Sequence, residues 1–169
     1  EALKKGIFSI NKFFGKKLAL NLVKSNKFDL IIANNVVAHV PNLNDFLSGV
    51  EILLNKKGSF VAEFPHLLNL IKEDQFDTIY HEHFSYFSLN TFIKALKINN
   101  LFVYDVELVN THGGSLRVYS SKLKNRKRSK NLNNLLNTEN NFKINHIKTY
   151  DDFNKRVFIK LKSFKNFIE

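Results

Sequence analysis

The sequence contains no cysteine and no methionine, and only two prolines and six glycines among its 169 residues. The absence of cysteine excludes disulfide bonds and thiolate metal sites in this stretch. It is also compatible with a reducing compartment, and we expect a cytoplasmic protein. No apolar run approaches the roughly 20 residues of a membrane-spanning helix. The start of the chain shows no signal-peptide pattern, so we expect neither export nor a membrane partner.

The missing methionine includes the initiator, because the chain begins at Glu1. Residues 1–5, followed by Gly6, resemble the last turn of a helix with its glycine stop. At the other end, an amphipathic pattern that begins at Thr149 continues to Glu169 without a cap. We therefore expect a fragment of a longer protein.

The formal net charge of +11 is distributed unevenly along the chain. Residues 1–110 hold 12 Lys/Arg and 11 Asp/Glu, whereas residues 111–169 hold 14 and 4. Lysine dominates the excess and is interspersed with asparagine, which is typical of a solvated basic face or a linker. We therefore expect no nucleic-acid partner. A basic nucleic-acid-binding module over residues 122–148 is the alternative.

Apolar periodicity alternates between strand-like and helix-like segments, which predicts an α/β fold with a mostly parallel sheet. A nearly continuous apolar run at residues 28–33 predicts a strand buried on both faces. Residues 122–148 are polar, basic and rich in asparagine, which indicates a linker or irregular region. The five predicted strands cover residues 7–10, 28–33, 59–64, 101–109 and 115–121, and the last two form an antiparallel hairpin.

Predicted helices lie between these strands. Asn42 is a candidate cap for a helix that ends at Lys56-Lys57-Gly58. Ser88 is a candidate cap for a second clear helix. A capping box at residues 149–152 would begin the last helix. The remaining helices are predicted near residues 15–25 and 67–72.

Residues 80–88, Tyr-His-Glu-His-Phe-Ser-Tyr-Phe-Ser, concentrate proton-transfer groups between two apolar segments. Histidine exchanges protons near neutral pH, and an adjacent glutamate can orient it or raise its basicity. The alternative is a purely structural role, as a polar loop that caps the helix starting at Ser88. The composition of this segment is compatible with both, and a catalytic role is favoured by its place after a strand end, described next.

Other polar residues follow the predicted strands at their carboxyl ends, where doubly wound sheets bind ligands. Asn34, Asn35 and His39 come just after the strand at 28–33. Glu63 closes the strand at 59–64, and the 80–88 segment follows it. We expect these groups to converge on one rim of the sheet, although a buried histidine bonded to a backbone carbonyl would also explain His39.

Two further patterns give weaker evidence of a binding or metal site. His112-Gly113-Gly114 could expose backbone N–H groups to a phosphate, but a plain hairpin turn explains it equally well. His81 and His83 would point the same way on a strand, so a metal-dependent hydrolase is an alternative, although the zinc-protease spacing on a helix is absent. His66 and His146 have no supporting neighbours and are predicted to be surface residues.

The order of the motifs resembles the S-adenosylmethionine-dependent sugar C-methyltransferases, bacterial enzymes that act on nucleotide-linked 4-keto-deoxysugars. The similarity covers about residues 6–121 and continues more weakly to the end. It is carried by three segments: residues 28–46, 76–88 and 111–119.

The resemblance implies a three-part protein with a cysteine-rich zinc module, a Rossmann-like methyltransferase domain and a C-terminal sugar-nucleotide-binding domain. Residues 1–121 would be the C-terminal part of the methyltransferase sheet, and residues 122–169 a linker and the beginning of the C-terminal domain. Zinc is expected only in the module that this sequence lacks. The glycine-rich cofactor loop is also missing.

The resemblance also implies site residues. His83 is the candidate base that removes a proton beside the substrate ketone, with Glu82 orienting it, and Tyr80 and His39 are candidates to stabilise the resulting enolate oxygen. The candidates to bind S-adenosylmethionine are Asn34, Asn35, Phe13 and Phe14. The candidates to bind the substrate diphosphate are His112, Gly113, Gly114 and Arg117. The sugar, the nucleotide and the oligomeric state stay open.

Overall fold

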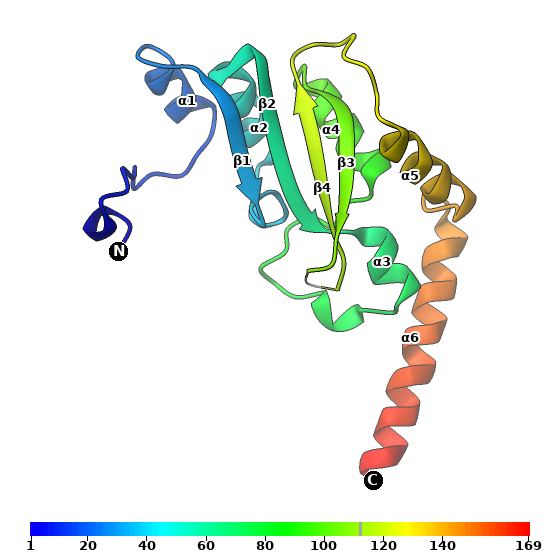
Figure 1. Ribbon diagram of the computed structural model, residues 1–169. Helices are drawn as coiled ribbons and strands as arrows, with labels where there is room; N and C mark the ends of the chain where they lie inside the picture. Colours follow the sequence, from blue (N-terminus) through cyan, green and yellow to red (C-terminus); the bar gives the residue numbers. More distant parts are fainter. Residues whose placement is uncertain (112) are drawn as a thin grey trace.

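The computed structural model describes residues 1–111 and 113–169 of the chain (Figure 1). Its elements, in chain order, are η1 (Leu3–Lys5), α1 (Lys16–Leu22), β1 (Phe28–Asn34), η2 (Val37–His39), α2 (Leu43–Leu53), β2 (Leu54–Pro65), α3 (Leu67–Lys72), η3 (Phe76–Thr78), α4 (Leu89–Ile98), β3 (Phe102–Val109), β4 (Ser115–Ser121), α5 (Lys130–Asn141) and α6 (Ile147–Ile168).

Four strands form one mixed sheet in the order β1-β2-β4-β3. β1 runs parallel to β2, with Ile32 opposite Val61. β4 runs antiparallel to both β2 and β3. The α/β class and the terminal antiparallel hairpin are therefore confirmed, and four of the five predicted strands are present. The prediction of a mostly parallel sheet is wrong for the described residues, because only β1 and β2 pair in parallel.

The predicted strand at residues 7–10 is wrong. The described chain is irregular there, and the side chains of Ile7 and Phe8 are 58% and 85% exposed. A strand needs a neighbour to satisfy its backbone N–H and C=O groups, and these residues join no sheet in the structure.

The predicted end of the helix at Lys56-Lys57-Gly58 is also wrong, because α2 ends at Leu53 and these residues belong to β2. The glycine has a different role. A Cβ at Gly58 would lie 3.0 Å from the carbonyl oxygens of both Phe28 and Asp29. Glycine therefore permits the close approach of β1 to β2.

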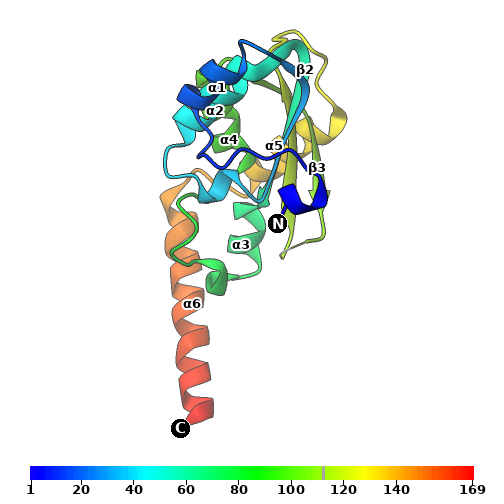
Figure 2. The ribbon, with the colours of Figure 1, turned by 90° about the vertical axis from the view of Figure 1, so that its left-hand side faces the viewer.

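One face of the sheet is covered by helices, and Figure 2 shows α2 and α4 on that side. The core between them is aromatic, with the rings of Phe64 and Phe92 packed edge to face at 4.7 Å between centroids. The largest fully buried side chains include Phe60, Phe64, Phe92, Leu47, Leu116 and Leu132. The packed helices support the sheet from this face. The loops at the carboxyl edge of the sheet therefore begin from a rigid base.

The opposite face of β1 is open in the described structure. Phe28, Leu30 and Ile32 alternate along this face and are 43%, 53% and 60% exposed, while Ala33 on the other face is buried. The prediction that this strand is buried on both faces is therefore wrong for one face. The continuous apolar run showed the strand but did not show what covers it.

Two of the predicted helix caps are present. The side chain of Asn42 accepts a hydrogen bond from Asp45 N at 3.0 Å at the start of α2. Ser88 and Thr91 form a reciprocal capping box at the start of α4. The capping box predicted at residues 149–152 is wrong, because α6 begins at Ile147 and Thr149 lies inside it.

The segment at 122–148 is not irregular throughout, because residues 130–141 form α5. Ser129 caps this helix through a 3.0 Å bond from Leu132 N. Leu132, Leu135 and Glu139 recur at helical spacing and are buried. Asparagine is a weak helix former, so the composition did not predict a helix here. Tertiary packing of its apolar side chains stabilises it.

The long helix α6 extends away from the sheet (Figure 1) and has no buried residue. It is attached near its middle, where Arg156 donates to Asp74 at 2.9 Å and to Ile71 O at 2.7 Å. Lys160 also pairs with Asp74 at 2.8 Å. Among the described helices, none is both long and apolar enough to cross a bilayer.

Candidate functional site

The site is built on the loops that leave β1 and β2 at their carboxyl ends. Asn35 follows β1 with a left-handed backbone, φ 53°, which asparagine tolerates better than most residues. Its N–H donates to Glu63 O at 2.8 Å, which fixes the turn against β2. His39 ends the short helix η2 immediately downstream, and Pro65 ends β2. The predicted convergence on one rim is therefore present for Asn35 and His39.

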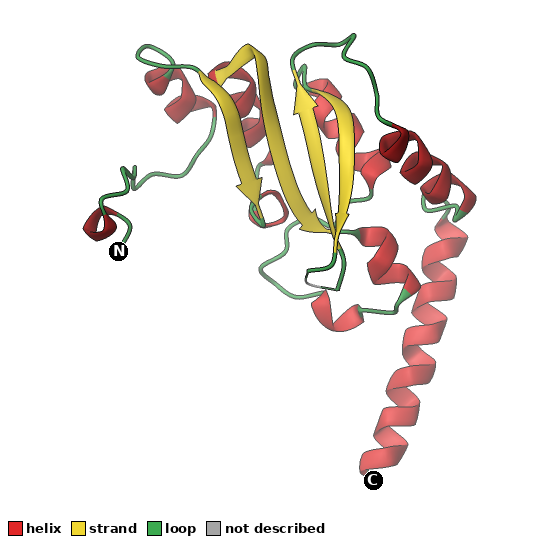
Figure 3. Cartoon of the chain, viewed as in Figure 1, coloured by secondary structure: helices red, strands yellow, loops and turns green. Residues whose placement is uncertain are grey.

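The segment of residues 79–88 lies against this rim. Figure 3 shows it as a loop between η3 and α4, not as a strand. It is docked onto η2, because Phe84 N and Ser85 N donate to Ala38 O at 2.9 and 3.2 Å. Main-chain hydrogen bonds thus bring the two histidine-bearing segments together.

His83 lies at the centre of the loop. Its Nδ1 is 3.2 Å from Thr78 O, and its Nε2 is 3.4 Å from the hydroxyl of Tyr80. A carbonyl oxygen can only accept, so Nδ1 carries the hydrogen and the neutral ring exposes a lone pair on Nε2. Lone-pair nitrogens of this kind accept protons in general base catalysis.

His39 is held in the same way. Its Nδ1 lies 2.9 Å from Glu82 O, which leaves Nε2 as the free nitrogen of the neutral ring. The ring centroids of His39 and His83 are 4.7 Å apart. The ring of Tyr80 is 4.5 Å from that of His83 on its other side. Three aromatic groups that can exchange or share protons therefore form one cluster.

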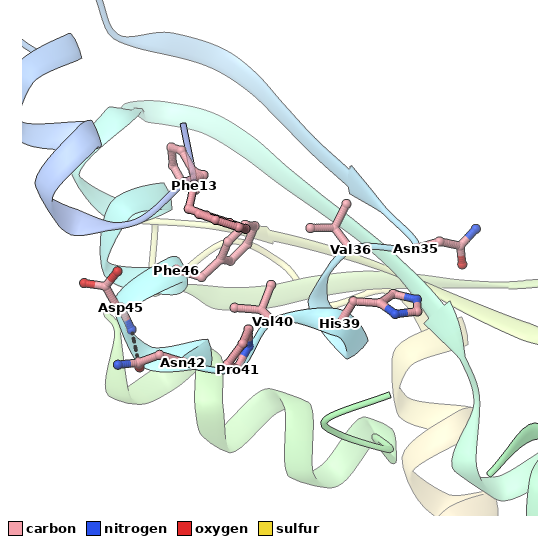
Figure 4. Close-up of a pocket in the computed structure, with 10 residues that line it drawn as sticks. Phe13, Asn35, Val36, His39, Val40, Pro41, Asn42, Asp45 and Phe46 are labelled. Carbon is pink, nitrogen blue, oxygen red and sulfur yellow. Dashed lines mark hydrogen bonds between the residues drawn. The ribbon is translucent and has the colours of Figure 1, made fainter. Parts of the chain in front are cut away.

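Two pockets meet at this cluster. One, of about 620 Å³, is mainly apolar and is lined by Phe13, Phe14, Asn35, Val36, His39, Val40, Pro41, Asn42, Asp45 and Phe46. The other, of about 280 Å³, is lined by Asn35, His39, Pro65, Thr78, Tyr80 and His83. Figure 4 shows Phe13 and Phe46 at one end of the larger pocket, and Asn35 and His39 at the other.

The shared residues Asn35 and His39 thus connect an apolar compartment to a compartment that contains the histidine cluster. Asn34, the other predicted cofactor residue on this rim, is exposed and lines neither pocket. Phe14 packs edge to face on Phe46 at 5.2 Å, whereas Phe13 is fully exposed.

The structure gives Glu82 a different role from the predicted one. Its side chain is exposed and makes no hydrogen bond or ion pair with any described residue. Its backbone carbonyl orients His39, and the carbonyl of Thr78 orients His83. The orienting groups are main-chain atoms, which a sequence motif does not reveal.

The groups predicted to hold a diphosphate are engaged within the protein. Arg117 donates to Glu63 at 2.8 and 2.9 Å and to Glu107 at 2.9 Å. The hydrogen bond to Glu63 is the main cause that raises the pKa of the Arg117 guanidinium, so this group stays charged. Tyr119 also donates to Glu107, at 3.0 Å.

The glycine turn is likewise packed against the protein. Gly113 and Gly114 have φ of 75° and 103°, which glycine adopts readily. The N–H of Gly114 donates to Thr111 O at 2.8 Å, and Gln75 donates to Gly113 O at 2.8 Å. These bonds are those of a structural hairpin turn. His112 lies outside the described residues.

Two residues of the site were not predicted. Thr78 supplies the carbonyl for His83, and the hydroxyl of Tyr86 lies 3.4 Å from that same oxygen and 3.2 Å from Tyr80 N. Tyr86 belongs to the segment of residues 80–88, and this position in the sequence could have identified it as a site residue. The ring of His81, by contrast, is exposed and 6.4 Å from that of Tyr80.

His66 was predicted to be a surface residue, which is wrong. It is 1% exposed, and its Nε2 lies 2.8 Å from Glu139 Oε1. The described residues include no group of three or more His, Asp or Glu side chains arranged to hold a metal ion.

Comparison with known proteins shows that the chain is similar to C-methyltransferases. Residues 110–169 match the family model described as a C-methyltransferase C-terminal domain. The chain is also 42% identical over 92 residues to C-methyltransferase NovU from Streptomyces niveus. That match covers 54% of this chain and 22% of NovU, so the chain spans about a fifth of the length of this relative.

Among solved structures, an S-adenosylmethionine-dependent methyltransferase from Thermotoga maritima, described as a possible histamine N-methyltransferase, superposes with a TM-score of 0.52. The match covers 72% of this chain and 67% of that chain at 15% identity. Identity at that level shows a shared fold only, which is the Rossmann-like methyltransferase fold.

Proposed function

Because this chain is related to the C-methyltransferases in sequence and has a methyltransferase fold, we propose that it carries the base of an S-adenosylmethionine-dependent C-methyltransferase. The substrate would be a nucleotide-linked 4-keto-deoxysugar. The observation that carries the proposal is the pair of imidazoles at the junction of two pockets, each with Nδ1 on a main-chain carbonyl, and with Nε2 of His83 beside the Tyr80 hydroxyl.

Carbon is a poor nucleophile until a neighbouring proton has been removed. His83 Nε2 would take a proton from the carbon beside the ketone, so that the C–H bond breaks and its electron pair forms the enolate. The hydroxyl of Tyr80 lies 3.4 Å from the same nitrogen, where a hydrogen bond to the ketone oxygen would stabilise the developing charge. His39, 4.7 Å away between ring centroids, could serve the same oxygen only as an imidazolium, because Glu82 O accepts from its Nδ1 and Nε2 of the neutral ring has no hydrogen to donate.

The larger pocket is suited to part of the cofactor. Its apolar wall of Phe14, Val36 and Phe46 matches an adenine ring, and Asn35 offers polar atoms where this pocket meets the smaller one. S-adenosylmethionine supplies an electrophilic methyl group when it is bound. Asn35 and His39 would place the substrate carbon within reach of that group, because both residues line both pockets.

The chain provides only part of a cofactor site. Its six glycines, at positions 6, 15, 49, 58, 113 and 114, form no glycine-rich phosphate or cofactor loop. Every lining residue of both pockets belongs to residues 1–121, the first of the two domains proposed from the sequence, and residues 122–169 would be the second.

Substitution of His83 tests the proposal, with the protein made from its complete reading frame. We expect His83→Ala to reduce methyl transfer from S-adenosylmethionine by at least about a hundredfold, as loss of a general base does. Binding of the cofactor, measured by calorimetry, should stay within about threefold of wild type, because His83 does not line the larger pocket. The acceptors would be 4-keto-6-deoxyhexoses linked to thymidine, uridine, guanosine and cytidine diphosphates.

The matched control is His81→Ala, since His81 is an exposed histidine two residues away. It should transfer methyl groups like the wild type. Wild-type turnover in His83→Ala would remove His83 as the base. Absence of methylated product from every nucleotide-linked sugar, with wild-type protein that binds the cofactor, would refute the substrate class.

A further inference from the structure

A buried hydrogen-bonded pair connects two distant parts of the chain next to the candidate site. Glu139 on α5 and His66, directly after β2, both have fully buried side chains, 2.8 Å apart. A buried carboxylate is costly unless hydrogen bonds replace its water. Glu139 meets that requirement, because it also accepts from Leu89 N at 2.6 Å, from Asn90 N at 2.9 Å and from Asn90 Nδ2 at 2.7 Å.

The hydrogen bonds define the ionisation of this pair. Burial would raise the pKa of Glu139, but the hydrogen bonds from His66, Asn90 and Leu89 outweigh it and hold the pKa below its ordinary value. The carboxylate only accepts, so the Nε2 of His66 carries a hydrogen. Its Nδ1 is buried and has no hydrogen-bond partner among the described residues.

The position of the pair links it to the loop that carries His83. His66 directly follows Pro65, which lines the smaller pocket. It forms an isolated parallel bridge with Phe87, and Leu67 N donates to Phe87 O at 3.0 Å. Glu139 holds the next residues of the same chain segment, at the start of α4.

From Phe87 the connection continues through Tyr86. The Tyr86 hydroxyl lies 3.4 Å from Thr78 O, the same oxygen that accepts from His83 Nδ1. Glu139 therefore fixes the end of a loop whose other contacts set the orientation of the proposed base, without touching either pocket.

We propose that Glu139 is a positioning residue for methyl transfer. Through His66 and the first turn of α4, it holds the loop of residues 78–88 so that His83 presents Nε2 to the substrate. This inference rests on the proposed function for its kinetic consequence. It makes the segment after the sheet, which the C-methyltransferase C-terminal domain model covers, a part of the catalytic apparatus.

Glu139→Gln tests this role, because glutamine keeps the size but replaces one acceptor oxygen with a donor. We expect kcat to fall by about tenfold or more, the usual loss when a group behind a catalytic residue is changed. KM and cofactor affinity should stay within about threefold, because Glu139 lines neither pocket. The control is Glu51→Gln, which breaks an ion pair to Lys122 at the other end of the sheet.

A second pair of variants approaches the contact from the other side, in case Glu139→Gln folds poorly. His66→Gln retains an N–H that can reach Glu139, so kcat should be largely preserved. His66→Leu should lose kcat to the same degree as Glu139→Gln. Equal activity of the two His66 variants, or a kcat of Glu139→Gln within about twofold of Glu51→Gln, would overturn the proposal.

Nitrogen-15 NMR of the imidazoles separates this proposal from the proposed function. In the wild type, His83 should show the tautomer with hydrogen on Nδ1, and Glu139→Gln should shift it toward a mixture. That change would be seen even if no nucleotide-linked sugar were methylated. An unchanged His83 signal in folded Glu139→Gln would refute the positioning role, whatever the activity of the wild type.

Discussion

At the scale of single residues, the site depends on backbone carbonyls more than on charged neighbours. Thr78 O and Glu82 O each receive the Nδ1 hydrogen of one imidazole. Fixing the tautomer in this way presents both Nε2 atoms as acceptors in the neutral rings. Such an arrangement tolerates a change in the Glu82 side chain but not a change in the path of the main chain.

Tyr86 controls that path, which gives a prediction. Its hydroxyl is within 3.4 Å of Thr78 O and Tyr80 O and accepts from Tyr80 N at 3.2 Å. Tyr86→Phe should therefore loosen the turn that orients His83 and lower kcat by about tenfold, with cofactor affinity unchanged. Steady-state kinetics and calorimetry would measure the two effects.

The matched control for Tyr86→Phe is Tyr104→Phe, which removes a hydroxyl bonded to Ser59 on the sheet. Tyr104 lines neither pocket of the site, so its variant should keep wild-type kcat. If both variants behave alike, the hydroxyl of Tyr86 does not position His83.

At the scale of elements, the start of α4 is the point where the catalytic loop joins the rigid core. Ser88 Oγ accepts from Thr91 N at 3.2 Å, and Thr91 Oγ1 accepts from Ser88 N at 3.1 Å. Loss of such a cap costs about 1 kcal/mol of unfolding free energy. Ser88→Ala should show that loss in urea denaturation, whereas Ser85→Ala, whose hydroxyl makes no hydrogen bond to a described residue, should not.

The elements that are specified by residues close together in the sequence were predictable. The caps at Asn42 and Ser88 and the apolar run of β1 specify α2, α4 and β1 through nearby residues. The histidines at 39 and 83 were predicted to converge because parallel strands end at one edge. The structure brings their rings to 4.7 Å.

What the sequence did not show depends on distant contacts. Helix α5 is rich in asparagine and is stabilised by burial of Leu132 and Leu135 against the core. His66 has no polar neighbour in sequence, and its partner Glu139 is 73 positions away. The roles of Thr78 and Glu82 lie in their carbonyl groups, which every residue has.

At the scale of the whole molecule, two acidic residues attach the basic C-terminal segment to the rest of the protein. Glu139 binds His66 and the start of α4, and Asp74 binds Arg156 and Lys160. Hydrogen bonds from Lys160 and Arg156 hold the pKa of Asp74 below its ordinary value. Asp74 thus pairs with two cations of the basic segment, and Glu139 anchors α5 to the start of α4.

These attachments predict acid sensitivity. A carboxyl group with a lower pKa in the folded state stabilises that state above its unfolded pKa, near 4 for Asp and Glu, and the stabilisation is lost as pH falls through the folded pKa. Chemical denaturation from pH 7 to 2.5 should therefore show constant stability down to about pH 5 and a steep loss below about pH 4. The double variant Asp74→Asn, Glu139→Gln should be less stable at pH 7 and lose less of its stability across the acid range. Parallel curves for the double variant and the wild type would mean that other carboxyl groups control acid unfolding.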